Sequence, residues 1–341
     1  MRIAALVPCL SLASGYVFRP EDEADFRNPN LPGLFNYTES QFDVATGSSY
    51  WTSSYITGDD GRQYLAINHL LTTYAPTPVC RSSILDLETR DYWVDLTYCL
   101  PKNGSGFDNG LPLVADYGTY AFGSKSADSV ASMYTYAHTD KSFSFDLEWT
   151  LSSRVMLNGG SGIIPFGAVP VNATEWGVPA GRTEGTITID NKTIAVDPEN
   201  SFTWYDRQIS HGAPKNWTWF ELNFPGSAIK ASVWAWDLPG HETARFATVR
   251  VGDSYHVLTH KLDFDSARTW TSPNSNITYP LAWNITFENG DHLSITSLRD
   301  DQEMYGGKAL VDSAYEGFIE VKGSFFGQEE GFGVVEIVSV F

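Results

Sequence analysis

The chain is poor in positive charge and has no long apolar run after its first residues. Its 341 residues include 22 Lys and Arg against 41 Asp and Glu, a net charge of −19. A nucleic-acid backbone and an anionic membrane surface would both repel such a chain, so we expect neither as a partner. Beyond residue 13 no segment approaches the ~18 apolar residues of a transmembrane helix, which argues against stable membrane insertion.

Several catalytic motifs are also missing. The sequence contains no Gly-x-Ser-x-Gly, no His-Glu-x-x-His, no P-loop and no Gly-x-Gly-x-x-Gly. Only His256 and His260 are close in sequence, and on a strand they would lie ~13 Å apart, too far for one metal ion. We therefore expect neither a metal nor a cofactor. Carboxylates are too numerous for the sequence to select a glycosidase pair, so a carbohydrate-active protein stays an alternative.

The first thirteen residues have the features of a secretory signal peptide. Arg2 precedes an apolar stretch, and Ser11-Leu-Ala13 is a small-x-small cleavage site. A buried N-terminal strand is the alternative. Seven Asn-x-Ser/Thr sites also favour the secretory pathway, lumenal or secreted. The candidate glycosylation sites are Asn36, Asn103, Asn172, Asn191, Asn216, Asn276 and Asn284.

Cysteine is scarce, with three residues in the chain. Cys9 would leave with the signal peptide, and Cys80 and Cys99 would remain as an even pair. In an oxidising compartment such a pair predicts one structural disulfide. Two thiols are too few for a thiolate metal site.

The remaining pattern is β almost throughout. Residues 143–151 alternate strictly between apolar and polar side chains, and residues 186–196 read as a hairpin. Residues 284–296 form a second hairpin around Asn289-Gly290, a pair that favours a type I′ turn. Further strands are expected at 228–236, 246–251 and 318–321. We predict an all-β protein of barrels or sandwiches, with domains at 14–199 and 200–341.

Trp204-Tyr-Asp-Arg-Gln208 is the most informative segment. On a strand, Trp204, Asp206 and Gln208 share one face, while Tyr205 and Arg207 share the other. On the first face, Asp206 and Gln208 would line one polar cavity beside the indole of Trp204. Arg207 would clamp a ligand oxygen or the neighbouring domain, or pair with a carboxylate as a purely structural staple.

Residues 229–236 form a second candidate segment. Small aliphatic side chains alternate with Lys230, Ser232, Trp234 and Trp236. We expect the tryptophan face to line the interior of a ligand cavity, since small aliphatics pack outward more easily than two indoles. The alternative is an ordinary pair of tryptophans in a core.

These segments resemble the AttH / carotenoid 1,2-hydratase (CrtC) family. The resemblance rests on residues 204–208, Trp217-Thr-Trp-Phe220, and the endings Tyr315–Gly323 and Gly331–Glu336. Weaker similarity covers Ser49–Thr52 and Leu65–His69. The family implies two lipocalin-like antiparallel β-barrel domains. The signal peptide and glycosylation sites make the chain look most like the fungal branch of kievitone hydratase and the Diels–Alderases.

That branch implies a secondary-metabolite enzyme that acts on an apolar small molecule without a cofactor. We put first a Diels–Alderase, which would catalyse a [4+2] cycloaddition by orienting a polyketide or terpenoid. Asn68, Asp206, Gln208 and Lys230 are the polar candidates. The substrate-binding candidates are Trp51, Trp204, Tyr205, Arg207, His211, Trp219, Trp234 and Trp236.

Two alternatives stay open. A hydratase would add water to a C=C bond, with Asp206 as the acid and His211 or His69 as the base. A lipocalin-like carrier would bind apolar ligands without turnover. Fold alone does not choose among these functions, because function depends on the site.

Overall fold

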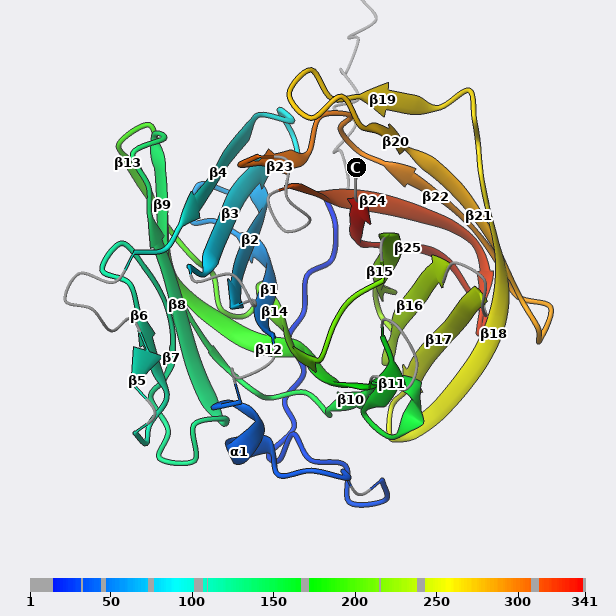
Figure 1. Cartoon of the computed structure of the whole chain (residues 1–341), viewed down its shortest axis with the longest axis horizontal. Coiled ribbons are helices and arrows are strands. Elements are labelled where there is room, and N and C mark those ends of the chain that lie inside the picture. The colour runs from blue at the N-terminus through cyan, green and yellow to red at the C-terminus, as the bar shows by residue number, and fades with distance from the viewer. Residues whose placement is uncertain are drawn as a thin grey trace, which may run out of the picture.

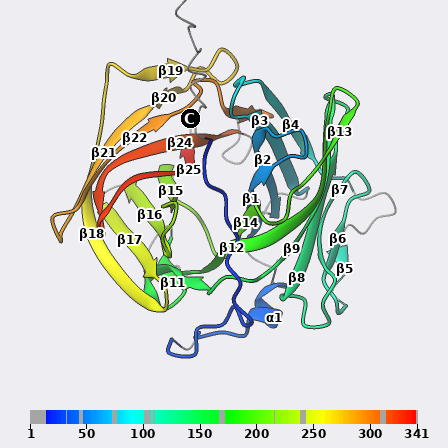
Figure 2. The same ribbon diagram turned by 180° about the vertical axis from the view of Figure 1, so that it is seen from behind.

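Two β domains lie side by side in the computed structural model (Figures 1 and 2). The signal-peptide candidate falls outside the described residues. The structure describes residues 15–31, 33–43, 47–72, 77–100, 107–108, 110–166, 172–214, 216–237, 243–307 and 313–339. In this part of the chain no helix is long and apolar enough to span a membrane.

The first domain is a curled sheet, here called the half-barrel. Its strands pair antiparallel in the order β4-β3-β2-β1-β14-β12-β9-β8-β7-β6-β5, and β10, β11 and β13 pair with β12. Its elements are α1 (Tyr37–Ser40), β1 (Ser48–Thr57), β2 (Gln63–Thr72), β3 (Val79–Asp86), β4 (Tyr92–Tyr98), β5 (Phe107–Asp108), β6 (Val114–Asp116), β7 (Tyr120–Ser124), β8 (Ser132–His138), β9 (Phe143–Thr150), β10 (Met156–Leu157), β11 (Ile163–Pro165), β12 (Asn172–Ile189), β13 (Lys192–Ala195) and β14 (Phe202–Ser210).

The second domain, here called the barrel, closes on itself because β22 pairs with both β21 and β24. Its strand order is β22-β21-β18-β17-β16-β15-β25-β24, with β23 beyond β24. Its strands are β15 (Asn216–Asn223), β16 (Ile229–Asp237), β17 (Thr243–Val251), β18 (Ser254–Phe264), β21 (Ala282–Phe287), β22 (His292–Ser297), β23 (Glu303–Tyr305), β24 (Ser313–Phe325) and β25 (Gln328–Ser339), and the short β19 (Thr269–Thr271) and β20 (Thr278–Pro280) pair with each other.

The local patterns predicted these elements well, and the all-β two-domain fold is confirmed. Strand β9 buries every second residue, as its alternation requires. The 186–196 hairpin turns at Asp190 and Asn191, both at positive φ. The second hairpin also forms, but its expected type I′ turn is wrong. Among its turn residues only Gly290 has positive φ, and the Asn289 side chain instead accepts a hydrogen bond from the Asp291 N–H.

The change from one sheet to the other comes later than the boundary expected near residue 200. Strand β14 pairs with β1 and β12 and so belongs to the half-barrel. The chain enters the barrel only at β15, after Ser210. This placement puts the face of Asp206 on the half-barrel and opposite the first barrel strand.

Each domain has its own hydrophobic core, and a third, strongly aromatic core fills the interface between them. On β16 the aliphatic residues Ile229, Ala231 and Val233 face the barrel interior, whereas Trp234 and Trp236 join the interface core. The expectation that the small aliphatic side chains pack outward is therefore wrong, and the tryptophan face lies at the domain interface, where Trp234 lines a cavity. Because strand side chains alternate, the small side chains of β16 pack inside the barrel and its two indoles pack where the two sheets meet.

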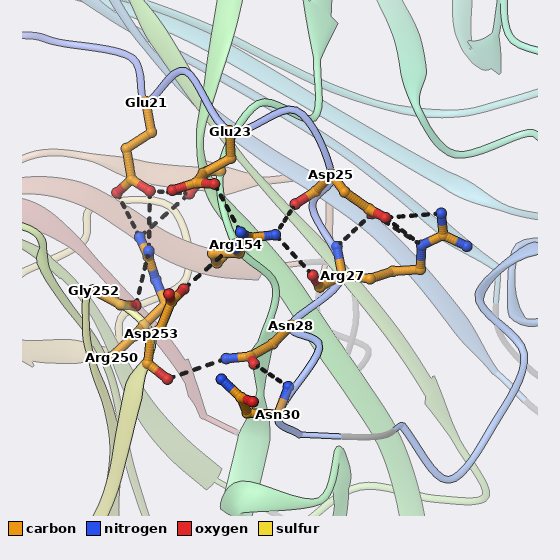
Figure 3. A network of polar contacts seen from close by, with 11 residues as sticks. Glu21, Glu23, Asp25, Arg27, Asn28, Asn30, Arg154, Arg250, Gly252 and Asp253 are labelled. Carbon is orange, nitrogen blue, oxygen red and sulfur yellow. Dashed lines mark hydrogen bonds and ion pairs between the residues drawn. The ribbon is translucent and has the colours of Figure 1, made fainter.

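An N-terminal segment, residues 15–31, runs across both domains and ties them together (Figure 3). Glu21 pairs with the buried Arg250 of β17 at 2.5 Å. Arg154, next to the half-barrel strand β10, pairs with Glu23 at 3.0 Å and with Asp253 at 3.3 Å. Phe18 packs in the interface core. This segment therefore helps to fix the relative position of the two domains.

The structure also bears on the export features. Cys80 and Cys99 form a disulfide, as predicted. The Asn103 site lies outside the described residues, and the other six candidate glycosylation asparagines are all exposed. Their positions are accessible to a glycan, and glycosylation itself stays a prediction.

Candidate active site

Four half-barrel strands place one row of side chains on the interface. The register aligns Asp206 of β14 with Trp51 of β1, Trp51 with His69 of β2, and His69 with Arg81 of β3. Side chains at aligned positions of neighbouring strands lie on the same face, about 5 Å apart. An acid, an indole, an imidazole and a guanidinium therefore stand side by side.

Four barrel strands present a facing row. Trp234 of β16 aligns with Trp219 of β15, Trp219 with Glu336 of β25, and Glu336 with Glu316 of β24. The rings of Trp51 and Trp219 meet edge to face at a centroid distance of 5.0 Å. The two rows thus come into direct contact across the interface.

A cavity of about 210 Å³ lies between the two rows. Its wall is mostly aromatic and aliphatic, and it includes the side chains of Asp206, Glu336, His69, Gln208 and Arg81. The remaining lining residues are Gly47, Ser48, Ser49, Trp51, Leu71, Thr72, Phe166, Ser210, Gly212, Ala213, Trp217, Trp219, Trp234 and Val338. An apolar pocket with a few converging polar groups is typical of a small-molecule site.

Glu316 links the two rows. Its carboxylate accepts hydrogen bonds from Trp51 Nε1 at 2.9 Å and from Arg81 Nη1 at 3.2 Å, and it lies 3.4 Å from His69 Nδ1. Burial alone would raise the pKa of Glu316, but the hydrogen bond with His69 and the charge of Arg81 hold the pKa below its usual value. Glu316 is therefore an ionised residue that fixes the cavity wall.

His69 is held between both rows. Its Nε2 lies 2.9 Å from Ser49 Oγ, and its Nδ1 lies beside Glu316 and Arg81. Burial lowers the pKa of His69, although Glu316 opposes that effect. The ring is therefore neutral near pH 7 and suited to hydrogen bonding rather than to carrying charge.

Ligand atoms of His69, Glu316 and Glu336 lie within 4.8 Å of one another, the spacing of a metal site. However, Arg81 Nη1 already contacts Glu316 and His69 at 3.2 and 3.3 Å. Its guanidinium supplies the positive charge that a cation would bring, and it would repel a second one. These residues do not fit a metal ion.

Asp206 is buried and has few hydrogen-bond partners. Trp204 Nε1 lies 3.4 Å from Asp206 Oδ1, a long contact for a hydrogen bond. Burial, together with the nearby carboxyls of Glu221 and Glu336, raises the pKa of Asp206 to about 8. Asp206 is therefore protonated at neutral pH and can act as a proton donor in the cavity.

Gly177 makes room for this carboxyl group. It aligns with Asp206 on the neighbouring strand β12. A Cβ atom at position 177 would lie 2.5 Å from Asp206 Oδ1 and 3.1 Å from Trp204 Nε1. The absence of a side chain at Gly177 therefore sets where the acid can sit.

Glu336 faces Asp206 from the barrel side. Trp217 Nε1 donates to its carboxyl group at 3.0 Å. Burial and the charge of Glu316 raise the pKa of Glu336 to about 7. The cavity thus holds two carboxyl groups whose pKa values are both raised toward neutral pH, which suits proton transfer there.

Glu175 is a third carboxyl group just behind the cavity wall. It accepts hydrogen bonds from Gln208 Nε2 at 3.2 Å and from Asn158 Nδ2 at 2.9 Å. Burial and the charge of Asp206 raise its pKa well above the ordinary value. Glu175 therefore lies behind the lining, where it contacts the cavity residues Gln208 and Asp206.

The structure brings together six of the residues that the sequence singled out. These are Trp51, His69, Asp206, Gln208, Trp219 and Trp234, which all line the cavity. Trp204 and Trp236 lie outside the lining, in the surrounding interface core. As predicted, the side chains of residues 204, 206 and 208 lie on the opposite face of β14 from those of Tyr205 and Arg207.

The other five predicted residues lie away from the cavity. Tyr205 donates to Gln41 in the half-barrel core, and Arg207 donates to the backbone carbonyls of Ser40 and Asp43. Arg207 thus has a structural role, but it acts through backbone carbonyls of the half-barrel rather than through the carboxylate pair that was expected. Its guanidinium also lies 4.1 Å from the centre of the Tyr50 ring.

The last three of these residues, Asn68, Lys230 and His211, also lie away from the cavity. Asn68, next to His69 on β2, points into the half-barrel and donates to Thr135. Lys230 donates to Asn223 at 2.7 Å in a separate polar cluster. His211 is exposed and is absent from the lining, so the structure does not support it as a base.

Sequence reasoning missed Glu316, Glu336, Arg81 and the wall residue Phe166 as site residues. Glu316 and Glu336 had a usable signal. Each interrupts an apolar part of its strand, residues 314–319 for Glu316 and residues 332–338 for Glu336, and a buried carboxylate there must serve a partner or a reaction. Phe166 had no such signal, because its contacts with Trp217 and Trp234 depend on the docking of two domains.

Two relatives that match this chain over nearly its full length carry the names of enzymes. The chain is 38% identical over 332 residues to kievitone hydratase of Fusarium solani subsp. phaseoli, covering 95% of this chain and 91% of the relative. It is 31% identical over 335 residues to dehydratase asqC of Emericella nidulans, covering 95% and 94% of the two chains.

A solved structure agrees with these relatives. The crystal structure of kievitone hydratase from Nectria haematococca matches with a TM-score of 0.87 and 33% identity, over 95% of this chain and 98% of that one. The profile of the AttH-like family matches residues 81–339. That match includes β3 to β25 and most of the cavity. The chain belongs to the AttH-like family.

Proposed function

We propose that this protein is a hydro-lyase that adds water to, or removes water from, a carbon–carbon double bond of a small secondary metabolite. One observation carries the proposal. A mostly apolar cavity holds Asp206, protonated near neutral pH, and Glu336, whose pKa of about 7 leaves it partly ionised there. Hydration of an alkene needs such an acid and such a base. The two enzyme relatives, a hydratase and a dehydratase, support it.

The roles follow from the chemistry of the two groups. Asp206 transfers its proton to one alkene carbon, and the other carbon becomes cationic. A water molecule attacks that carbon and gives its extra proton to Glu336, so the product gains one H₂O. Dehydration is the reverse sequence. In that direction the carboxylic acid of Glu336 protonates the leaving hydroxyl, and the carboxylate of Asp206 removes the proton from carbon.

His69 is better suited to position the water than to serve as the base. Burial lowers its pKa, and Arg81 lies 3.3 Å from its Nδ1, so formation of an imidazolium is unfavourable there. Ser49 and Glu316 hold the ring in one orientation. A fixed neutral imidazole at the cavity wall can bind and orient a water molecule.

The [4+2] cycloaddition is the second candidate. The aromatic lining from Trp51, Trp217, Trp219 and Trp234 favours it, because a pericyclase needs mainly a shaped wall. It gives no role to a proton donor and a base in the same cavity. We therefore rank water addition or removal ahead of it.

Product mass separates the two candidates. Metabolites of the native producer with and without this gene should be compared by mass spectrometry. The proposed function predicts that the lost product and the accumulating precursor differ by one water. An accumulating isomer of the lost product would support the cycloaddition. An unchanged metabolite profile would favour a non-catalytic binding protein over both enzymes.

A further inference from the structure

We infer that the cavity is a binding site for small organic cations, of the size of a substituted benzene, held by indole rings and by the two cavity carboxylates. The inference rests on the proposed function only in taking this cavity as the active site. It names a ligand class that can be tested before any substrate is known.

The walls provide the first argument. Indoles of Trp51, Trp217, Trp219 and Trp234 line one cavity. Aromatic faces attract cations, indole most strongly, and the attraction grows where water is excluded. Clusters of aromatic side chains are a known way to recognise quaternary ammonium groups.

The orientation of these indoles adds to the argument. The N–H group is the positive edge of the ring and would repel a cation. Three of the four N–H groups already donate to protein acceptors: Trp51 to Glu316, Trp217 to Glu336 and Trp219 to Ser232. These positive edges are therefore neutralised by wall residues.

The charged groups around the cavity give the second argument. Arg81 and Glu316 form an ion pair 3.2 Å apart and cancel. His69 is neutral, and Glu175 lies behind Gln208. The remaining titratable groups of the lining are Asp206 and Glu336, which carry no charge when protonated and two negative charges when ionised.

The pH dependence of binding follows from this balance. The pKa of Glu336 is about 7 and that of Asp206 about 8, so the cavity becomes negative as pH rises through this range. A permanent cation should bind more tightly at pH 9 than at pH 6. A neutral ligand of the same shape should bind nearly equally at both.

Cavity size sets the choice of probe. The cavity measures about 210 Å³, and an engineered apolar cavity of about 150 Å³ holds benzene. Benzyltrimethylammonium is a fitting probe because its charge does not depend on pH. Neopentylbenzene, in which carbon replaces the nitrogen, is its neutral isostere.

The experiment measures binding of both probes to the full protein by calorimetry and by quenching of tryptophan fluorescence. We expect the cation to bind at least tenfold more tightly at pH 9 than at pH 6, and the isostere to change less than twofold. Asp206→Asn and Glu336→Gln should each reduce the pH effect. Glu330→Gln, an exposed position on the same strand as Glu336, should leave it unchanged.

Equal affinity of the two probes at pH 9, or cation binding that ignores pH, would overturn the inference. This outcome needs no variant and so does not depend on whether a variant folds. The proposed function is judged separately by product mass. A protein that binds the cation but changes no metabolite by one water would retain the cation site and lose the hydro-lyase assignment.

Discussion

Two of the buried carboxyl groups at the domain interface, Asp206 of β14 and Glu221 of β15, differ in their hydrogen bonding and in their access to the cavity. At one end Asp206 lines the cavity, and its side-chain hydrogen bonds are a long contact of 3.4 Å from Trp204 Nε1 and one with the carboxyl group of Glu175. At the other end Glu221 of β15 accepts hydrogen bonds from Ser53, Tyr55 and Asn223, and it is absent from the cavity lining.

This difference in environment distinguishes a structural role for Glu221 from a catalytic role for Asp206. Both carboxyl groups have raised pKa values, about 8 for Asp206 and about 7 for Glu221, and burial is the main cause in each case. A shifted pKa alone therefore does not mark the active site. Glu221, held by three donors outside the cavity, stabilises the interface, whereas Asp206 lines the cavity and is available to a substrate.

The largest effect is expected from Asp206→Asn, which keeps the shape and removes the proton. Turnover should fall on the order of 10³-fold, within the range of general acid catalysis. Folding should be preserved, because the amide is neutral like the protonated acid. Single-turnover rates and thermal unfolding measure the two parts. A variant with a wild-type rate would end the assignment of Asp206 as the acid.

Glu221→Gln tests the other end of the interface. The new NH₂ group would face the donors Ser53, Tyr55 and Asn223, so hydrogen bonds are lost. The free energy of unfolding should fall by roughly 1–3 kcal/mol. Activity per folded molecule should stay within about twofold of wild type. A large loss of activity with unchanged stability would contradict the comparison.

Gly177→Ala sharpens the comparison with one methyl group. The added carbon would lie 2.5 Å from Asp206 Oδ1, so the carboxyl group must move. Since the displaced atom ends a short side chain, we expect little loss of stability and a fall in kcat of about tenfold. Glu330→Gln, at an exposed position, serves as the neutral surface control.

The pH profile gives a smaller effect. In the hydration direction Asp206 must be protonated and Glu336 ionised, so kcat/KM should form a bell with its maximum between about pH 7 and pH 8. The Asp206→Asn variant should lose the limb that falls above pH 8 from its residual rate. A flat profile for wild type would show that these groups do not titrate in catalysis.

Stability should follow pH in a defined direction. The pKa of Asp206 is about 8 in the folded protein, above its ordinary value of 3.8, so folding favours the protonated form. Its contribution to stability is full below pH 3.8 and is lost as pH rises to 8. Relative to Asp206→Asn, wild type should become less stable over this interval in denaturant titrations. The opposite trend would mean that Asp206 is ionised in the folded protein.

Local rules predicted the strands and one face of the site. Alternation placed Asp206 and Gln208 together and Arg207 on the opposite face, because strand side chains alternate whatever the tertiary context. The same rule did not show which face of β16 meets the partner domain. That choice depends on how the two sheets dock through Trp219 and Trp234. The local sequence pattern carries no information about this docking.

The partners of the acid were harder to predict for the same reason. Glu336, which lines the cavity, and Glu316, which holds its wall, lie more than 100 residues after Asp206. They come near it only because β24, β25 and β15 are aligned in one sheet. Lys230 was predicted as a cavity residue from its place beside Trp234. It belongs instead to the cluster of Asn223, since the cavity ends before that position.

The most direct test of the central claim is a metabolite profile of the native producer carrying Asp206→Asn at this gene. The account predicts that the normal product disappears and that a compound differing from it by one water accumulates. Accumulation of an isomer, or an unchanged profile with the variant protein present, would contradict the assignment of Asp206 as the acid of a hydro-lyase.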